Sequence, residues 1–296
     1  MSKRIACPIC GNNEVERLFE KQGCTFVQCL TDELVYIDPQ PDREELQEVY
    51  DRYGEEFFVL PESIAASGDY PDYRRRFIDF RQTNRLLEIG TAAGAFLIRC
   101  RKDGWDTYGV ELSAPSSRLA REQHGLNVIT GTIHDGGYEN DFFDVVVAWQ
   151  TLEHVTNPRE VIKEVWRILR PKGLFVLSVP CWKGISIRLL RKKYRYVGRD
   201  HLFYFSPKNM KLMLSDVGFS KIYTRTAGFN PIVFYKDIKR HMGNHEQNYT
   251  AENRMVEHVI TGIRQDRFLK GIHRIYSEMI TKLNIGDTLF AEALKE

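Results

Sequence analysis

The segment LLEIGTAAGAFL at residues 86–97 limits the possible folds of this chain more than any other part of it. It begins as a short apolar strand that ends in Glu88, continues as a turn of small residues, and then starts an amphipathic helix. A turn of this kind leaves the backbone bare, because a larger side chain would fill the space beside it. In open α/β sheets a ligand lies against such backbone at the carboxyl ends of the strands. The segment therefore predicts an α/β sheet with a ligand site at Gly90 and Gly94.

Three further segments each predict a strand. GVELS at 109–113 closes a second strand with Glu111, the position at which nucleotide-binding α/β folds hydrogen-bond a ribose. FDVVVAWQTLEHV at 143–155 begins with a continuous apolar run, which is typical of a strand buried on both faces. LRPKGLFVLSVP at 169–180 indicates the end of a helix, a turn and another buried strand.

These four motifs, in this order and at this spacing, resemble those of a class I S-adenosylmethionine (SAM)-dependent methyltransferase. The resemblance covers residues 86–180 and continues more weakly to Phe219. It implies a doubly wound, Rossmann-like α/β fold with a mostly parallel sheet of seven strands. The chain departs from the family pattern at Ala92, where the family usually has a further glycine. Alanine is small enough to keep the contact with the ligand.

The resemblance also implies that SAM lies across the turns that follow these strands. Gly90 and Gly94 would let the first turn pass close to the methionine part of SAM. Glu111 would accept hydrogen bonds from the ribose hydroxyls, and Glu88 would orient the turn and reach the amino group. The expected SAM-binding residues are Glu88, Gly90, Thr91 and Gly94 in the first turn, Glu111 and Leu112 after the second strand, Thr132 and Ile133 after the third, and Trp149 and Gln150 after the fourth.

Two histidines are candidate catalytic residues. The sulfonium carries the reactive methyl group, so the protein mainly aligns the acceptor and keeps water away. An oxygen or carbon acceptor also needs a base to take its proton, and histidine is suited to this near neutral pH. His154 follows the fourth strand, and His201 lies in a segment expected to cover the pocket. A structural, hydrogen-bonding role is the alternative for each of them.

Four of the six cysteines lie within the first 29 residues. Cys7 and Cys10 form a Cys-x-x-Cys-Gly knuckle, and tetrahedral zinc needs two more ligands from a second segment. That segment supplies Cys29, but Asp32 stands where zinc-ribbon-like leaders of similar methyltransferases have the fourth cysteine. Three possibilities remain open: Asp32 completes the site, Cys24 completes it from its separate position, or the site has lost its metal. Bound Zn²⁺ would be structural, because so small a module cannot build its own hydrophobic core.

The expected organisation has three parts. Residues 1–40 form the zinc-ribbon-like, Cys-rich module, residues 41–83 a helical lead-in that covers the pocket, and residues 84–296 the methyltransferase domain. The lead-in is expected to contain helices at 42–53 and 73–83.

Apolar residues recur at helical spacing near the end of the chain, which predicts a helical insertion over about residues 236–282. The last strand of the sheet is expected after it, within residues 285–294.

Composition limits the partners. The net charge of +2 gives no general attraction to nucleic acid or to membranes, so nucleic acid is not an expected partner. No apolar run approaches the roughly 20 residues that a membrane span needs, and the first residues lack the apolar core of a signal peptide. We therefore expect no transmembrane segment and a cytoplasmic protein. The sequence does not define the oligomeric state.

The expected function is SAM-dependent methyl transfer to a small-molecule or glycan acceptor, such as a nucleotide sugar, at an oxygen atom. Basic and aromatic residues alternate over residues 188–199. They form either a solvated helix face or a patch for a phosphate-bearing acceptor, an anionic lipid or RNA. One alternative function is a zinc-ribbon RNA methyltransferase, which the near-neutral charge disfavours. The other is a non-catalytic SAM-binding partner subunit, suggested by Ala92 and the displaced fourth cysteine.

Overall fold

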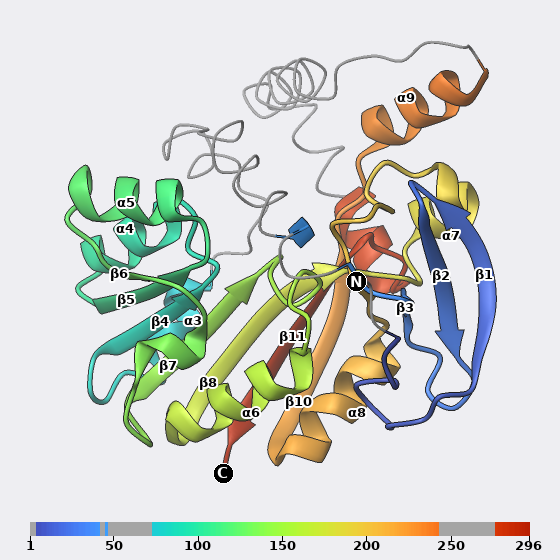
Figure 1. The fold of residues 1–296 in the computed structure, drawn as a ribbon. Helices are drawn as coiled ribbons and strands as arrows, with labels where there is room; N and C mark the ends of the chain where they lie inside the picture. The colour runs from blue at the N-terminus through green and yellow to red at the C-terminus, as the bar shows by residue number, and fades with distance from the viewer. Residues whose placement is uncertain (1–3, 42–44, 47–72, 243–275) are drawn as a thin grey trace.

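The structure is a computed structural model that describes residues 4–41, 45–46, 73–242 and 276–296. Its larger sheet contains seven strands: β4 (Arg85–Ile89), β5 (Asp106–Glu111), β6 (Asn127–Thr130), β7 (Phe143–Trp149), β8 (Leu169–Pro180), β10 (Phe219–Ala227) and β11 (Thr288–Lys295). The strand order is β10-β11-β8-β7-β4-β5-β6 (Figure 1). The five strands β4 to β8 pair in parallel, whereas β11 pairs antiparallel with both β8 and β10. This arrangement confirms the predicted mostly parallel, Rossmann-like sheet.

Most of the described helices lie between these strands in the chain, and α3 precedes the first of them. They are α3 (Arg74–Ile78), α4 (Ala95–Lys102), α5 (Ala114–Glu122), α6 (Pro158–Ile168), α7 (Ile185–Leu190), α8 (Pro207–Val217) and α9 (Pro231–Met242), with the 3-10 helices η1 (Ile133–Gly136) and η2 (Arg191–Lys193). Alternate residues of β7 face opposite sides of the sheet. Val146 and Ala148 belong to the hydrophobic cluster that α6 and α8 cover, and Val145 and Val147 to the cluster that contains residues of α3, α4 and α5. All seven residues of β7 are buried, as predicted for its apolar run.

The start of β7 carries a buried carboxylate that joins three strands. Asp144 accepts hydrogen bonds from the backbone N–H groups of Gln82, Thr83 and Asn84 at 2.7 to 3.0 Å, and it pairs with Arg170 of β8. Burial alone would raise the pKa of this carboxyl, but the guanidinium and the three N–H groups outweigh it and lower the pKa. The same bonds explain why α3 is shorter than the expected helix at 73–83: the N–H groups at 82–84 bind the carboxylate and do not continue the helix.

A second, four-stranded sheet lies beside the first one (Figure 1). It consists of β1 (Val15–Lys21), β2 (Cys24–Cys29), β3 (Val35–Ile37) and β9 (Phe203–Tyr204), all antiparallel. Because β9 comes from the later part of the chain, this sheet crosses the predicted boundary at residue 40. The N-terminal module also shares its apolar residues with the α6 and α8 side of the core, among them Ile9 and Tyr36.

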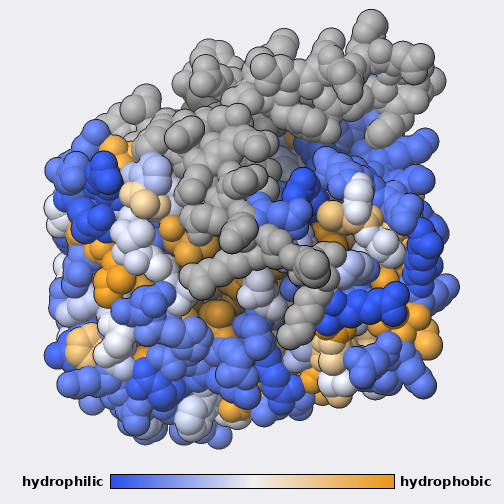
Figure 2. All heavy atoms as spheres, viewed as in Figure 1, coloured by the Kyte–Doolittle hydropathy of each residue, from blue (hydrophilic) through white to orange (hydrophobic). Residues whose placement is uncertain are grey.

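The predicted insertion is described only at its two ends. Its start lies within α9, residues 276–282 are helical, and residues 243–275 fall outside the described part of the chain. The helix expected at 42–53 also falls outside it, apart from residues 45–46. Within the described ranges, we find no helix with both the length and the apolar character to cross a membrane. Hydrophilic residues cover much of the described surface seen in Figure 2, with hydrophobic residues in smaller groups between them.

Candidate functional site

The turn between β4 and α4 contains the two glycines that the sequence analysis places at the ligand site. In the structure both glycines also have a role in the protein itself. Gly90 and Gly94 have φ values of +74° and +87°, which side-chain-bearing residues rarely adopt. A Cβ on Gly90 would lie 2.4 Å from Thr151 Oγ1, and one on Gly94 would lie 2.2 Å from Leu126 Cδ1. Glycine is therefore required at both positions because protein side chains already fill the space that a Cβ would occupy.

Thr91 and Ala92, between the two glycines, each form hydrogen bonds that stabilise the turn. The Thr91 hydroxyl is buried and donates toward the backbone oxygens of Glu88 and Val110 at 3.2 and 3.3 Å, so its side chain holds the turn. Ala92 has a φ of +47° and donates its N–H to Glu111 Oε2 at 2.7 Å. This left-handed backbone is a physical reason for the glycine that similar methyltransferases have at this position.

Two carboxylates lie at the tips of the neighbouring strands β4 and β5. Glu88 is 4% exposed, and its Oε2 has no hydrogen-bond partner among the described residues. Burial, and then the negative charge of Glu111, raise the pKa of Glu88 well above its ordinary value. Burial also raises the pKa of Glu111, although its Oε1 and Oε2 accept N–H groups from Ser113 and Ala92.

These two carboxylates meet the chemical requirements of SAM. An unpartnered buried carboxylate oxygen, as on Glu88, needs a proton or a cationic donor, and the amino group of SAM is such a donor. Glu111 lies at the strand end where a ribose is expected, next to Leu112, which is partly exposed. The residues present therefore fit the cofactor that the sequence predicts.

The other expected SAM-binding residues follow β6 and β7. Thr132 caps η1 and donates its hydroxyl to Asp135 at 2.7 Å, and Ile133 is buried behind it. Trp149 stacks in a tilted arrangement on Tyr73, with ring centroids 5.4 Å apart.

Gln150 follows Trp149 directly. It has a φ of +47° and donates its side-chain amide to Ser178 Oγ at 3.0 Å. Each of these three side chains therefore contacts another part of the protein. Thr132, Trp149 and Gln150 remain predicted SAM-binding residues.

The two predicted catalytic histidines lie together, although they are 47 positions apart in the sequence numbering (201 − 154). Their ring centroids are 4.8 Å apart, with the ring planes nearly perpendicular. His154 Nδ1 lies 2.8 Å from the backbone oxygen of Asp200. Burial and then the neighbouring His201 lower the pKa of His154 to about 4, and burial lowers the pKa of His201.

A carboxylate that the sequence analysis did not select adjoins this pair. Glu153 is fully buried, and burial raises its pKa well above the ordinary value. Its Oε1 lies 3.9 Å from His154 Nε2. An acid next to a histidine just past a buried strand was the feature in the sequence that could have identified it.

The turn that carries these residues is tied to the glycine turn. Thr151 donates its hydroxyl to the backbone oxygen of Ile89 at 3.1 Å, and the His154 N–H donates to the backbone oxygen of Thr151 at 3.0 Å. The histidine pair therefore belongs to the same edge of the sheet as the predicted SAM-binding turns.

Comparison with known families shows the family of the chain. A family model described as "Methyltransferase domain" matches residues 64–224, which is more than half of the chain. The chain belongs to this methyltransferase family. It is a SAM-dependent methyltransferase, as its motifs and its sheet indicate.

The relatives of this methyltransferase differ in how much of its sequence they match. An uncharacterized protein of Methanocaldococcus jannaschii is 26% identical over 212 residues, which are 69% of this chain and 96% of that protein. The ubiquinone biosynthesis O-methyltransferase of Cereibacter sphaeroides is 32% identical over 155 residues, which are 50% of this chain and 61% of that enzyme. The chain thus spans less than two thirds of the ubiquinone enzyme.

Solved structures show the same fold. A Thermotoga maritima SAM-dependent methyltransferase, described as a possible histamine N-methyltransferase, has a TM-score of 0.54 at 16% identity and covers 85% of this chain and 100% of its own. Phosphoethanolamine N-methyltransferase 2 of Haemonchus contortus has a TM-score of 0.56 at 14% identity and covers 95% of this chain and 71% of its own.

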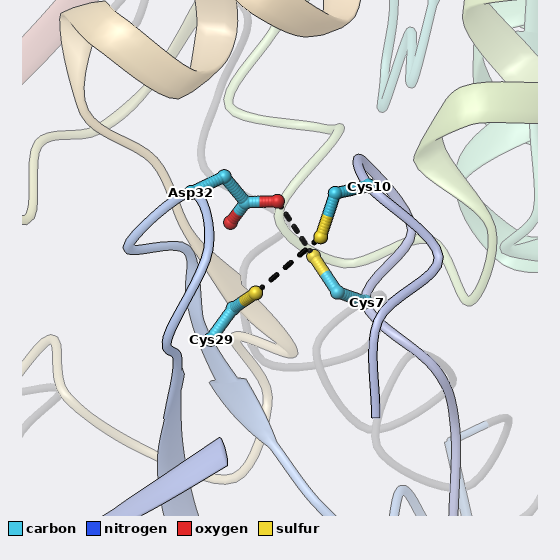
Figure 3. A group of neighbouring side chains, drawn as sticks. All are labelled: Cys7, Cys10, Cys29 and Asp32. Carbon is cyan, nitrogen blue, oxygen red and sulfur yellow. Dashed lines mark hydrogen bonds between the residues drawn. The ribbon is translucent and has the colours of Figure 1, made fainter. Parts of the chain in front are cut away.

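The methyltransferase also carries a cluster of four candidate metal ligands in its N-terminal module. Figure 3 shows Cys7, Cys10, Cys29 and Asp32 with their side chains pointing toward one another. Cys7 Sγ lies 3.0 Å from Asp32 Oδ2, and Cys10 Sγ lies 3.5 Å from Cys29 Sγ. One potential ligand atom from each residue lies within 4.8 Å of the other three. Three thiols and a carboxylate form a donor set that Zn²⁺ accepts.

The structure does not bring Cys24 into this cluster. Cys24 opens β2 and faces Lys21 across the hairpin, whereas Cys29 ends the same strand. Of the two alternatives for the fourth ligand, the geometry therefore favours Asp32.

One basic residue of the segment at 188–199 is engaged inside the protein. The Arg195 side chain is 3% exposed and forms an ion pair with the buried Asp237 at 2.7 Å, so it supports α9. Arg188, Arg191 and Lys192 are exposed on α7 and η2.

Proposed function

We propose that this methyltransferase transfers the methyl group of SAM to an oxygen atom of a small-molecule or glycan-type acceptor. The observation that carries the proposal is the pair His154 and His201 on the edge of the sheet where the predicted SAM-binding turns lie. A hydroxyl acceptor loses a proton during transfer, and a neutral imidazole can accept one. The lowered pKa values keep both rings neutral near pH 7. The O-methyltransferase named among the relatives supports oxygen as the acceptor atom.

SAM supplies the electrophilic methyl group, and the chain supplies binding and orientation. In this proposal the Glu88 carboxylate pairs with the amino group of SAM, and Glu111 accepts from the ribose hydroxyls. The turn at Gly90 and Gly94 carries the backbone that faces the methionine part. Arg188 and Arg191 are exposed, so their positive charges are available to a phosphate group on the acceptor.

Release of S-adenosylhomocysteine tests the proposal. The purified protein is incubated with SAM and separate panels of phenols, sugars, nucleotide sugars, amines and RNA, and the product is measured by mass spectrometry. We expect turnover with a hydroxyl acceptor. Turnover only with amines or RNA contradicts the proposal, and RNA turnover favours the zinc-ribbon RNA enzyme. No turnover while SAM binds supports a non-catalytic subunit.

Histidine variants test the proposed base. His154→Gln and His201→Gln are compared with His124→Gln, a matched control in the loop after α5. We expect kcat to fall about 100-fold or more for at least one of the first two, within the range of general-base catalysis. Calorimetry with SAM checks that each variant still folds. Unchanged kcat for both site variants contradicts the role of the histidines.

We also propose that Cys7, Cys10, Cys29 and Asp32 hold one structural Zn²⁺. The convergence of their side chains supports this, together with a donor set of three thiols and one carboxylate that suits Zn²⁺. Metal analysis of the purified protein should find zinc that Cys29→Ser loses and Asp32→Cys keeps. Cys24→Ser is the control and should keep it. Zinc content unaffected by Cys29→Ser contradicts the assignment.

A further inference from the structure

Glu153 is buried, and among the described residues no cation lies within hydrogen-bond distance of its carboxylate. Its side chain is 0% exposed, and neither carboxylate oxygen has a hydrogen-bond partner. The His154 Nε2 atom lies 3.9 Å from Oε1 of Glu153, which is too long for a hydrogen bond. A carboxylate held this way is stable only with a proton or a cation beside it.

The neighbouring imidazole of His154 presents a ring nitrogen toward this carboxylate. His154 Nδ1 lies 2.8 Å from the backbone oxygen of Asp200, which can only accept, so Nδ1 carries the proton. In the neutral ring Nε2 then has the lone pair, and it is Nε2 that faces Glu153. A histidine that binds a metal usually donates its other N–H to a backbone carbonyl in this way.

His201 completes a group of three. Its Nδ1 is buried without a hydrogen-bond partner, and its Nε2 lies 3.7 Å from Asp200 Oδ2. One potential ligand atom from each of Glu153, His154 and His201 lies within 4.8 Å of the others. The second carboxylate, on Asp200, adds negative charge beside the group.

The backbone holds these residues in place without an ion. The backbone oxygen of Glu153 accepts the N–H groups of Leu202 and Phe203 at 2.7 and 3.3 Å. Phe203 begins β9, which belongs to the four-stranded sheet, whereas Glu153 follows β7 of the seven-stranded sheet. The group therefore lies where the two sheets meet, and both sides are fixed by main-chain hydrogen bonds.

We propose that Glu153, His154 and His201 bind a divalent metal ion. Two imidazoles and one carboxylate are the ligand set of catalytic Zn²⁺ sites with an open position and of two-histidine, one-carboxylate iron sites. The inference deepens the proposed function and, for the role of the ion, rests on it: an ion there would favour the deprotonated form of an acceptor hydroxyl. With the ion bound, the two imidazoles would serve as its ligands and the proton of the acceptor hydroxyl would pass to solvent water, whereas in the ion-free protein an imidazole accepts it as described above.

Mn²⁺ is the probe that separates this site from the cysteine cluster, because thiolates favour Zn²⁺ and carboxylates suit Mn²⁺. The full chain is first incubated with one equivalent of Zn²⁺, to fill the cysteine cluster, and then titrated with Mn²⁺ without SAM or acceptor, while free Mn²⁺ is followed by electron paramagnetic resonance. The wild type should bind one Mn²⁺ per chain. Glu153→Gln and His201→Gln should bind it at least tenfold more weakly, and the exposed control Glu160→Gln should match the wild type.

Two results overturn the inference: a wild type that binds no Mn²⁺, or a Glu153→Gln variant that binds it as tightly as the wild type. Circular dichroism checks that the variants fold, and His201→Gln serves if Glu153→Gln does not. Mn²⁺ binding without turnover leaves this site standing while the proposed function fails. Turnover by a wild type that binds no metal here supports the proposed function and overturns the site.

Discussion

Glu88→Gln should change ligand-free stability and SAM affinity in opposite directions. In the ligand-free protein the carboxylate is 4% exposed, and its Oε2 has no partner among the described residues. Glutamine has the shape of the protonated acid and removes the buried charge. A buried charged group without a partner costs about 1–3 kcal/mol or more. We therefore expect the variant to be more stable than the wild type by about that amount at pH 8.

The pH dependence of this gain has a definite sign. The pKa of Glu88 is raised by burial and then by Glu111, so the folded state binds the proton more tightly than the unfolded state does. Such a carboxyl contributes stability that is fully present below its ordinary pKa of 4.5 and is lost as the pH rises toward the folded pKa. Relative to the wild type, the variant should gain stability between pH 5 and pH 8, as urea unfolding at each pH would measure.

Binding should respond in the opposite way. A hydrogen bond to a charged group contributes about 1.5–3 kcal/mol, which corresponds to a loss of roughly 10- to 150-fold in SAM affinity. Calorimetry with SAM measures this, with the exposed Glu122→Gln as the matched control. Two results would refute the reasoning: a variant that loses stability and affinity together, which would mark Glu88 as a structural residue, or SAM affinity equal to that of the wild type.

Three further predictions follow from the same structure. Glu111→Ala should weaken SAM binding at least tenfold (about 1.4 kcal/mol) because it removes the proposed ribose acceptor; unchanged affinity by calorimetry would exclude that role. Gly94→Ala should lower the free energy of unfolding by about 1–3 kcal/mol, because φ is +87° and the new Cβ would meet Leu126 Cδ1 at 2.2 Å; an equally stable variant would contradict this. Asp144→Asn should cost about 3–5 kcal/mol at pH 7, against about 0.5 kcal/mol or less for the exposed control Glu160→Gln in urea unfolding. Because the pKa of Asp144 is lowered, its contribution is present above the ordinary value of 3.8 and is lost as the pH falls through the folded pKa, so a difference that persists in acid would disprove the ion pair.

The sequence alone determined the sheet and the family. The apolar run of β7 and the strand–turn–helix at β4 are local patterns. Such patterns predict a strand or a helix from neighbouring residues alone, without knowledge of the tertiary structure. Their order along the chain also determined which strand ends would meet, because parallel strands place their carboxyl ends at one edge.

Only the tertiary structure decided which side chains lack a partner and which distant residues meet. Glu153 stands beside His154 in the sequence, yet its backbone oxygen is held by the N–H groups of residues 202 and 203, a long-range contact that no local pattern predicts. In the same way, Asp32 and not Cys24 joins the cysteine cluster because the β1–β2 hairpin carries Cys24 to its opposite end. Residue type and spacing specify candidate ligands, whereas long-range packing decides which of their atoms are close enough to act together.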